Sequence, residues 1–139
     1  MQISRKALYA IRALTYVAST RGDRLCTITE IAEKEEIPRE YIAKILKELT
    51  VKGFLASYRG IKGGYRLNKS PDDISLLNIL EAVQGPFGRP NRSTNDEDRK
   101  IFDGALNDFW SDLQGDVRGK LSQMNLARID YSRFYPQMN

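Results

Sequence analysis

IPREYIAKILKEL at residues 37–49 and YRGIKGGYRL at residues 58–67 are the two segments of this 139-residue chain that decide its fold. In the first segment, apolar residues recur at three- and four-residue spacing, which predicts a helix with one buried face. Pro38 suits its first turn, because an amide there has no helical partner to lose. The predicted face comprises Tyr41, Ile42, Ile45, Leu46 and Leu49, and Gly53 can end the helix in the left-handed conformation.

The second segment predicts a β-hairpin with a basic tip. Strand-forming residues at 54–58 and 65–67 flank a glycine-rich loop that carries Arg59 and Lys62. A shorter helix is expected just before residue 37, because Thr27 and Glu30 have the spacing of a capping box. Helix, turn, helix and hairpin in this order predict a winged helix-turn-helix.

Two more helices are expected around this unit. The first runs from about Ser4, its N-cap, to Ser19. Another starts after Ser75 and stops at Gly85, and residues 86–96 form a loop without apolar periodicity.

A long helix is predicted from about Asp96 to Met124, with three acidic residues, Asp96, Glu97 and Asp98, in its first turn. The aromatic tail that follows, with Tyr131, Phe134 and Tyr135, is expected to fold back onto the body. Antiparallel packing of two copies of the long helix would make a homodimer. The expected dimerisation residues are Phe102, Leu106, Phe109, Leu113, Val117 and Leu121.

The predicted fold class is therefore mainly α with a small β-hairpin: a winged helix-turn-helix domain plus a long dimerisation helix. We expect residues 1–85 to form the DNA-binding domain, 86–96 the loop, and 97–139 the long helix and tail. In this fold the second helix of the pair presents side chains to base edges in the major groove of double-stranded DNA. The hairpin, or wing, lies along the backbone or enters the minor groove. A homodimer would read a two-fold-symmetric operator.

Charge supports a polyanionic partner. The chain carries a net +4, with 22 Lys and Arg against 18 Asp and Glu, but the charge is uneven. Residues 1–70 hold 14 basic and 7 acidic residues, a net +7, whereas residues 71–139 carry a net −3. A basic front half favours nucleic acid, although the Lys and Glu residues of a helix can also be simply solvated.

Five segments resemble the IscR/NsrR/CymR transcriptional regulators, the Rrf2 family. They are residues 3–10 (ISRKALYA), 28–32 (ITEIA), 37–42 (IPREYI), 58–67 (YRGIKGGYRL) and 79–86 (ILEAVQGP). The resemblance covers about 60% of the chain and, more loosely, the long helix. It implies a homodimeric winged-helix DNA-binding protein with a long crossing helix.

The resemblance also implies a set of DNA contacts. Arg59 matches the wing arginine that enters the minor groove. The best-known member has a base-reading glutamate where this chain has Ala43, so Arg39 and Lys44 are the expected base readers. The full set of expected DNA-binding residues is Ser4, Arg5, Lys6, Arg39, Glu40, Tyr41, Ala43, Lys44, Arg59, Gly60, Lys62 and Gly64.

The loop after Gly85 departs from the family. Many members hold an iron–sulfur cluster there with three cysteines, but residues 87–96 contain none, and Cys26 is the only cysteine in the chain. Because cluster iron needs thiolate ligands, we expect no cofactor and no metal. The expected signal is a small molecule, a partner protein or oxidation of the Cys26 thiol. An effector pocket is expected between the long helix and the body, lined by Phe102, Phe109 or Trp110.

Two other classes of function fit the sequence less well. A winged-helix module that binds protein rather than DNA is the alternative to a sequence-specific repressor. An enzyme is excluded in practice, because the chain has no histidine, no paired-carboxylate motif and no phosphate-binding loop. Without a targeting segment or an apolar membrane span, the expected location is the cytoplasm.

Overall fold

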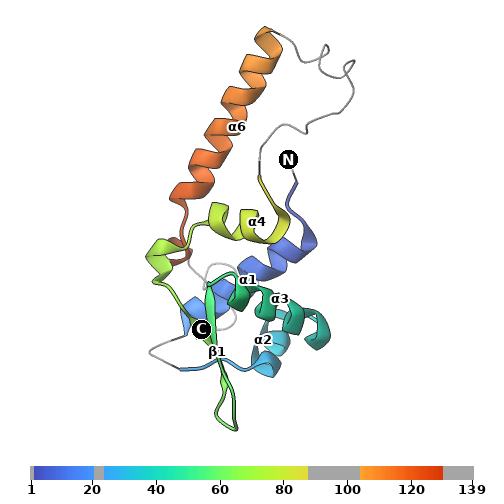
Figure 1. Cartoon of the computed structure of the whole chain (residues 1–139), viewed down its shortest axis with the longest axis vertical. Helices are drawn as coiled ribbons and strands as arrows, with labels where there is room; N and C mark the ends of the chain where they lie inside the picture. Colours follow the sequence, from blue (N-terminus) through green and yellow to red (C-terminus); the bar gives the residue numbers. More distant parts are fainter. Residues whose placement is uncertain (1, 21–23, 88–103, 130–139) are drawn as a thin grey trace.

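The computed structural model describes residues 2–20, 24–87 and 104–129. Five α-helices, one two-stranded sheet and two short 3₁₀ helices lie in these ranges (Figure 1). The predicted winged-helix architecture, mainly α with one β-hairpin, is confirmed. In chain order the elements are α1 (Arg5–Ser19), α2 (Ile28–Glu35), α3 (Arg39–Val51), β1 (Leu55–Tyr58), β2 (Gly64–Leu67), η1 (Pro71–Asp73), α4 (Leu76–Gln84), α6 (Ala105–Gln123) and η2 (Leu126–Arg128).

The helix starts follow from side chains that cap them. Ser4 caps α1 by accepting a hydrogen bond from the amide of Ala7. Thr27 and Glu30 form the predicted capping box of α2. Ser75 caps α4 in the same reciprocal way, with Asn78 in the third helical position. Each cap satisfies amides that the first turn of a helix leaves without an intrahelical partner.

Helix α3 differs from expectation in two details. Pro38 is its N-cap rather than its first helical residue. Tyr41 lies at the margin of the apolar face, with 36% of its surface exposed, whereas the other four predicted residues of the face are buried. The sharp turn between α2 and α3 is made by Glu36, whose φ of 54° is left-handed. Gly53, with φ of 88°, follows α3 as predicted.

The core forms around α1. Its residues Ala7, Ala10, Ala13 and Leu14 are completely buried, and α3, α4 and β2 all pack against this helix. Small side chains on the buried face let neighbouring helices approach closely while excluding water. The α1 helix thus fixes where α3 and the hairpin stand relative to each other.

The hairpin is tied to the helices by a third short segment. Strands β1 and β2 pair antiparallel, from Leu55 opposite Leu67 to Tyr58 opposite Gly64. At the edge of β2 that does not face β1, the amides of Cys26 and Tyr65 each donate to the other's carbonyl, at 2.8 Å. Gly64 approaches this segment so closely that a Cβ there would lie 2.7 Å from the Cys26 carbonyl oxygen.

The predicted continuous helix from Asp96 to Met124 is wrong at its start. Helix α6 begins at Ala105, and Gly104 before it has φ of 76°, which interrupts a right-handed helix. The acidic residues 96–98 therefore do not lie in the first turn of α6; they fall outside the described residues. Apolar periodicity reports a common face but not a break in the backbone.

The end of α6 is fastened to the body. Val117 and Leu121 pack against the cluster of Ala7, Leu80 and Phe87. After the helix, the amide of Leu76 donates to the Met124 carbonyl at 2.8 Å, and the amide of Leu126 donates to the Ile74 carbonyl at 3.0 Å. Leu126 is buried in the main core. The predicted return of the aromatic tail concerns residues outside the described range.

The Gly64 contact predicts that Gly64→Ala destabilises the fold. The new Cβ would meet the Cys26 backbone, and φ of 155° is a conformation that alanine rarely adopts. We expect the free energy of unfolding to fall by about 2 kcal/mol, measured by urea denaturation. Ser57→Ala, on the exposed part of β1, is the control and should change it by less than about 0.5 kcal/mol. Equal effects of the two substitutions would contradict the close-approach argument.

Candidate nucleic-acid interface

The first turns of α3 present a polar surface. Arg39, Glu40 and Lys44 are exposed, and Ala43 between them is half-buried. Because the apolar face of the helix points into the core, these side chains project from the opposite side. The helix thus has a rigid support and a free outer face near its N-terminus, which is the part of a recognition helix that meets base edges.

A cluster of aromatic and charged side chains supports this end of α3. The rings of Tyr9 and Tyr41 meet edge to face, 5.5 Å between centroids. The Arg12 guanidinium stacks on the Tyr9 ring and bonds the fully buried Glu35 carboxylate at 3.2 Å. A buried carboxylate needs such a partner, since burial alone would disfavour its charge. The cluster therefore joins α1, α2 and α3. Tyr41 packs against Tyr9 in this cluster and is also partly exposed to solvent.

The start of α1 is held by α4. The Ser4 amide donates to Gln84 Oε1 at 2.9 Å, and Gln84 Nε2 donates to the Gln2 carbonyl at 2.8 Å. Arg5 is exposed, but the Lys6 ammonium pairs with Glu48 of α3 at 2.6 Å. Of the predicted contacts in this segment, Arg5 is thus freely presented, whereas Lys6 already has an anionic partner.

The wing tip is rigid and basic. Arg59, Gly60 and Lys62 are exposed, and the Gly63 amide closes the turn by donating to the Gly60 carbonyl at 3.0 Å. Gly60 has φ of 114°, and a Cβ on Gly63 would lie 2.3 Å from the Tyr58 carbonyl oxygen. The glycines are therefore required by the turn itself. Gly64, expected at the DNA surface, lies against the Cys26 segment.

Residues that the sequence pattern did not single out also belong to this surface. Arg66, on the exposed side of β2, stacks its guanidinium 4.9 Å from the centre of the Tyr58 ring. Alternation along the strand could have identified Arg66, because its neighbours Tyr65 and Leu67 turn inward. Tyr9 could not have been found this way, since its role depends on the packing of α1 against α3.

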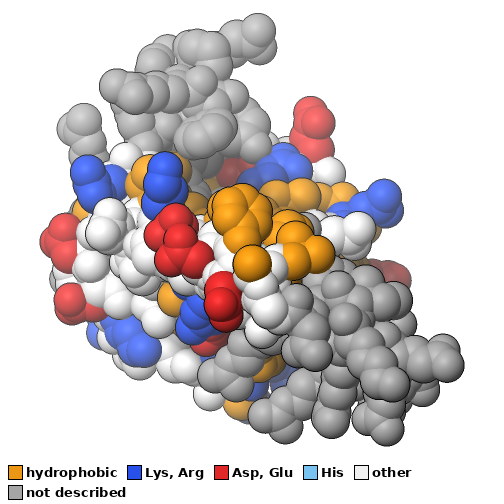
Figure 2. Space-filling view, turned by 90° about the horizontal axis from the view of Figure 1, so that it is seen from above, with side chains coloured by type: hydrophobic (Ala, Val, Ile, Leu, Met, Phe, Trp, Pro, Cys, Tyr) orange, Lys and Arg blue, Asp and Glu red, His pale blue; other side chains and the backbone are white. Residues whose placement is uncertain are grey.

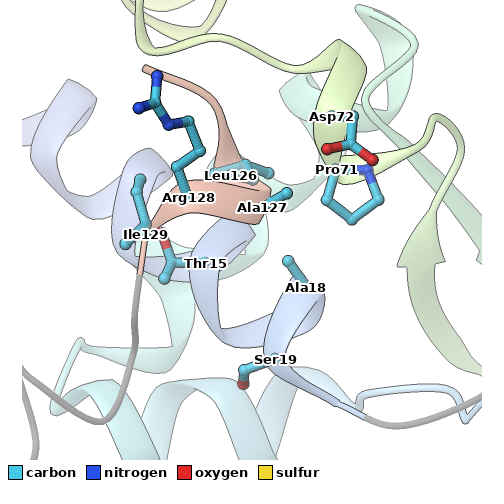
Figure 3. Close-up of a pocket in the computed structure, with 9 residues that line it drawn as sticks. All are labelled: Thr15, Ala18, Ser19, Pro71, Asp72, Leu126, Ala127, Arg128 and Ile129. Carbon is cyan, nitrogen blue, oxygen red and sulfur yellow. The ribbon is translucent and has the colours of Figure 1, made fainter.

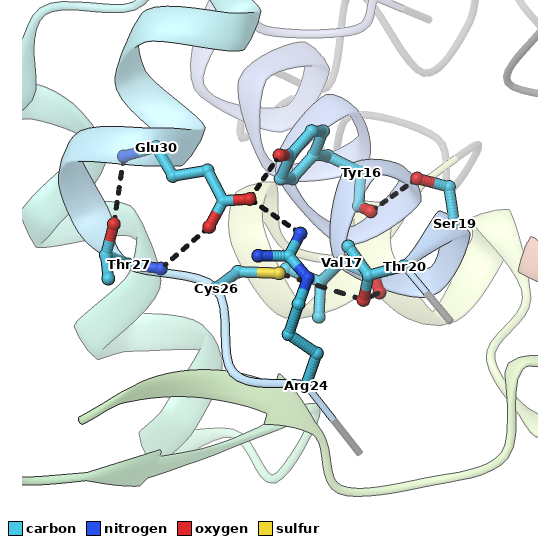
Figure 4. A network of polar contacts seen from close by, with 8 residues as sticks. All are labelled: Tyr16, Val17, Ser19, Thr20, Arg24, Cys26, Thr27 and Glu30. Atoms are coloured by element: carbon cyan, nitrogen blue, oxygen red, sulfur yellow. Dashed lines mark hydrogen bonds and ion pairs between the residues drawn. The ribbon is translucent and has the colours of Figure 1, made fainter. Parts of the chain in front are cut away.

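The Cys26 thiol lies inside the fold. The side chain is fully buried, and its Sγ contacts the Thr20 hydroxyl at 3.8 Å (Figure 4). Burial raises the pKa of the Cys26 thiol, and the hydrogen bond between this thiol and the Thr20 hydroxyl only partly opposes this. A protonated, inaccessible thiol reacts slowly with oxidants.

Beside Cys26, Glu30 is the centre of a polar network. Its carboxylate accepts hydrogen bonds from the Tyr16 hydroxyl and from Arg24, both at 2.6 Å (Figure 4). The Arg24 guanidinium holds the pKa of Glu30 below its ordinary value. Burial, together with the bond to Glu30, raises the pKa of Tyr16 to about 12. At neutral pH, Glu30 and Arg24 are therefore charged and the Tyr16 hydroxyl stays protonated, and the network fixes α2 against α1.

One open cavity of about 440 Å³ is formed where α1, η1 and η2 meet (Figure 3). Two hydroxyls in its lining are already used within α1: Thr15 donates to the Ile11 carbonyl and Ser19 to the Tyr16 carbonyl. Phe109 and Trp110, two of the residues predicted for an effector pocket, do not line it. Phe109 and Trp110 are exposed on α6, and Phe102 lies outside the described residues. The lining residues are Thr15, Ala18, Ser19, Pro71, Asp72, Leu126, Ala127, Arg128 and Ile129.

The two halves of α6 differ. The C-terminal half packs against the body through Val117 and Leu121, whereas Leu106, Phe109 and Trp110 of the N-terminal half are exposed. Figure 1 shows this half leading away from the helical body, and Figure 2 shows hydrophobic side chains gathered on the face seen from that end. We call Leu106, Phe109 and Trp110 the exposed stripe. Leu113 continues it and is half-buried.

Comparison with known proteins identifies the family. The model of the Rrf2 family, described as iron-dependent transcriptional regulators, matches residues 3–130. The chain belongs to the Rrf2 family. The members of this family, and the curated relatives of the chain, are named as transcriptional regulators rather than enzymes. This Rrf2 protein is accordingly a DNA-binding winged-helix regulator.

Individual relatives agree with the Rrf2 assignment. A protein of Synechocystis sp., "Putative HTH-type transcriptional regulator slr0846", is 30% identical over 94% of this chain and 88% of its own length. A "Putative HTH-type transcriptional regulator" of Aquifex aeolicus is 42% identical, over 58% of this chain and 56% of its own length. The structure of CymR, the global cysteine regulator of B. subtilis, has a TM-score of 0.78 at 24% identity, covering 91% of this chain and 94% of CymR. At this sequence identity, the similarity to CymR supports the fold alone.

The family description names iron dependence, and the residues present do not fit the iron–sulfur cluster expected for many family members. A cluster needs several thiolates, and this sequence has one cysteine, which is buried between α1 and β2, and no histidine. Among the described residues, no three or more His, Cys, Asp or Glu side chains are grouped to hold a metal ion. Within the same ranges, no helix combines the length and apolar character needed to cross a bilayer.

The burial of Cys26 predicts slow thiol chemistry. In the native protein, the thiol should react with Ellman's reagent at least about tenfold more slowly than in denaturant, because the thiolate is disfavoured and shielded. The absorbance of the released thiophenolate measures both rates, and the denatured sample confirms one reactive thiol per chain. Similar rates in the two samples would instead make Cys26 a workable redox sensor.

Proposed function

We propose that this protein is a homodimeric repressor that binds a two-fold-symmetric operator through α3 and the wing. The single observation that carries the proposal is the pairing of two exposed basic elements with a rigid support. Arg39 and Lys44 stand on the outer face of α3, and Arg59 and Lys62 stand on a wing fixed by the Cys26–Tyr65 bridge. Figure 1 places α2, α3 and the hairpin at the end of the molecule opposite the free half of α6. Residues 1–85 thus form the DNA-binding domain, which we call the head.

The exposed stripe supports the homodimer. Leu106, Phe109 and Trp110 are large apolar side chains on one side of α6, and a second copy offers the same surface. Two copies would place two recognition helices on one duplex, which multiplies the weak affinity of a single head. The expected Phe102, Leu113, Val117 and Leu121 extend this assignment, although the last two are already used within the chain.

For the signal, we favour a small molecule or a partner protein over oxidation of Cys26. The thiol is buried and its pKa is raised, so the structure offers it little reactivity. A ligand that changes the tilt of α6 would change the spacing of the two heads and thereby the affinity for the operator. The protein acts without the usual cluster, in the cytoplasm.

A winged-helix module that binds a protein is the second candidate. The exposed stripe could take a protein partner as well as a second copy. The two functions differ in their response to salt, because phosphate contacts release counterions and make DNA affinity fall steeply with ionic strength. Selection from a random DNA pool that returned no site, together with salt-insensitive binding of a protein, would favour this candidate.

Arg59→Ala should weaken operator binding by about tenfold or more, with the fold unchanged, because Arg59 is exposed and serves only the interface. The slope of log affinity against log salt should become shallower by about one. Fluorescence anisotropy on DNA selected from a random pool measures both quantities. Lys120→Ala removes the same charge from an exposed position on α6 and is the control. Normal binding by Arg59→Ala would disprove the role of the wing.

Phe109→Asp should convert the dimer to a monomer, because it places a carboxylate in the middle of the exposed stripe. Ser111→Asp is the matched control: it adds the same charge to an exposed position, two residues on and hence on another side of the helix. Light scattering after gel filtration should give the mass of one chain for the first and of two for the second. Two chains for both variants would place the dimer contact elsewhere.

A further inference from the structure

Ile61 is the most exposed large apolar residue in the described parts of the chain. Its side chain has a relative exposure of 106%, more than in an extended reference peptide, and it stands at the tip of the wing. Figure 1 shows the hairpin projecting past the helices at the end of the molecule that carries α2 and α3. Single apolar side chains on a surface are ordinary. Ile61 differs from such residues because a closed turn holds its backbone and because cationic side chains flank it.

The turn presents Ile61 rigidly. The Gly63 amide bonds the Gly60 carbonyl at 3.0 Å, so Ile61 and Lys62 are the two central residues of a closed turn. The backbone contacts of Gly63 and Gly64 leave the hairpin little freedom to bend. An apolar group fixed in this way loses little conformational entropy when a partner covers it.

The neighbours of Ile61 define the partner. Lys62 directly follows it and Arg59 lies two residues before it, and both are exposed cations. Arg66 adds a third cation on the same hairpin, stacked on Tyr58. An apolar tip between cations matches a narrow groove with a phosphate backbone on each wall and sugars and base edges within it. The minor groove of double-stranded DNA has this chemistry.

We propose that Ile61 enters the minor groove and is a specificity-determining residue that selects against guanine there. This inference rests on the proposed operator binding of the wing. In the minor groove, guanine adds the N2 amino donor to a floor that otherwise carries only acceptors. A sec-butyl side chain pressed against that amino group removes its water and supplies no acceptor, which costs affinity. Opposite an A·T pair, no donor is left without a partner.

Inosine separates this effect from readout in the major groove. An inosine–cytosine pair has the major-groove edge of G·C but lacks the N2 amino group, so its minor groove resembles that of A·T. In the operator selected from a random pool, each A·T pair outside the major-groove half-sites is replaced in turn by I·C and by G·C. Fluorescence anisotropy gives the dissociation constant of each duplex.

At one or more symmetric positions, the wild-type protein should bind I·C as well as A·T and bind G·C at least about fivefold more weakly. Ile61→Ala should reduce that G·C penalty to less than about twofold. Ile61→Asn, which supplies an amide acceptor, should accept G·C as well as A·T. Because the Ile61 side chain is fully exposed, both variants should keep the thermal midpoint of the wild type.

Lys62→Ala is the control for the electrostatic effect of the tip. It should weaken binding to all three duplexes by the same factor and make the salt dependence shallower, while the G·C penalty persists. An Ile61→Ala protein that keeps the full penalty, or a wild-type protein that binds G·C and I·C equally at every position, would overturn the proposal. Failure of the wild-type protein to select any DNA would instead disprove the operator-binding function.

Discussion

The buried alanine face of α1 is the constraint on which the rest of the structure depends. Ala7, Ala10 and Ala13 have no exposed surface, and they let α3, α4 and the hairpin pack directly against one helix. The recognition helix and the wing therefore share a single support. A larger side chain at any of these positions would separate them, since close-packed interiors have no spare volume. The relative placement of α3 and the wing is thus decided by residues that are buried in the core.

Local signals in the sequence predicted much of the fold. Capping residues such as Ser4, Thr27 and Ser75 act within one helical turn, so their effect can be identified without any tertiary information. The hairpin was predicted for a similar reason, because its glycines satisfy the turn that contains them. The predictions of these features match the structure because the interactions that determine them span only a few residues.

The misjudged features depend on contacts between distant residues. The break at Gly104 was not predicted, because periodicity continues across it. Tyr41 fits the apolar spacing of α3, but the position of Tyr9 on α1 decides that it lies at the edge of the core. Likewise, Val117 and Phe109 belong to one periodic stripe, although the first packs within the chain and the second is exposed. Spacing shows which residues share a face and leaves open what that face contacts.

The fastening of α6 at one end has a mechanical consequence. The bridge between Ser75 and Asn125 and the packing of Val117 hold its C-terminal end, while its N-terminal half leads away from the body (Figure 1). At 1.5 Å per residue, the 12 residues of α6 that precede Val117 make an arm of about 18 Å. A tilt of about 5° at the held part moves the far end by about 1.6 Å, given that length. The segment that follows α6 bonds to Ser75, the N-cap of α4, and Gln84 at the other end of α4 bonds the start of α1. The short helix α4 therefore connects the held end of α6 to α1.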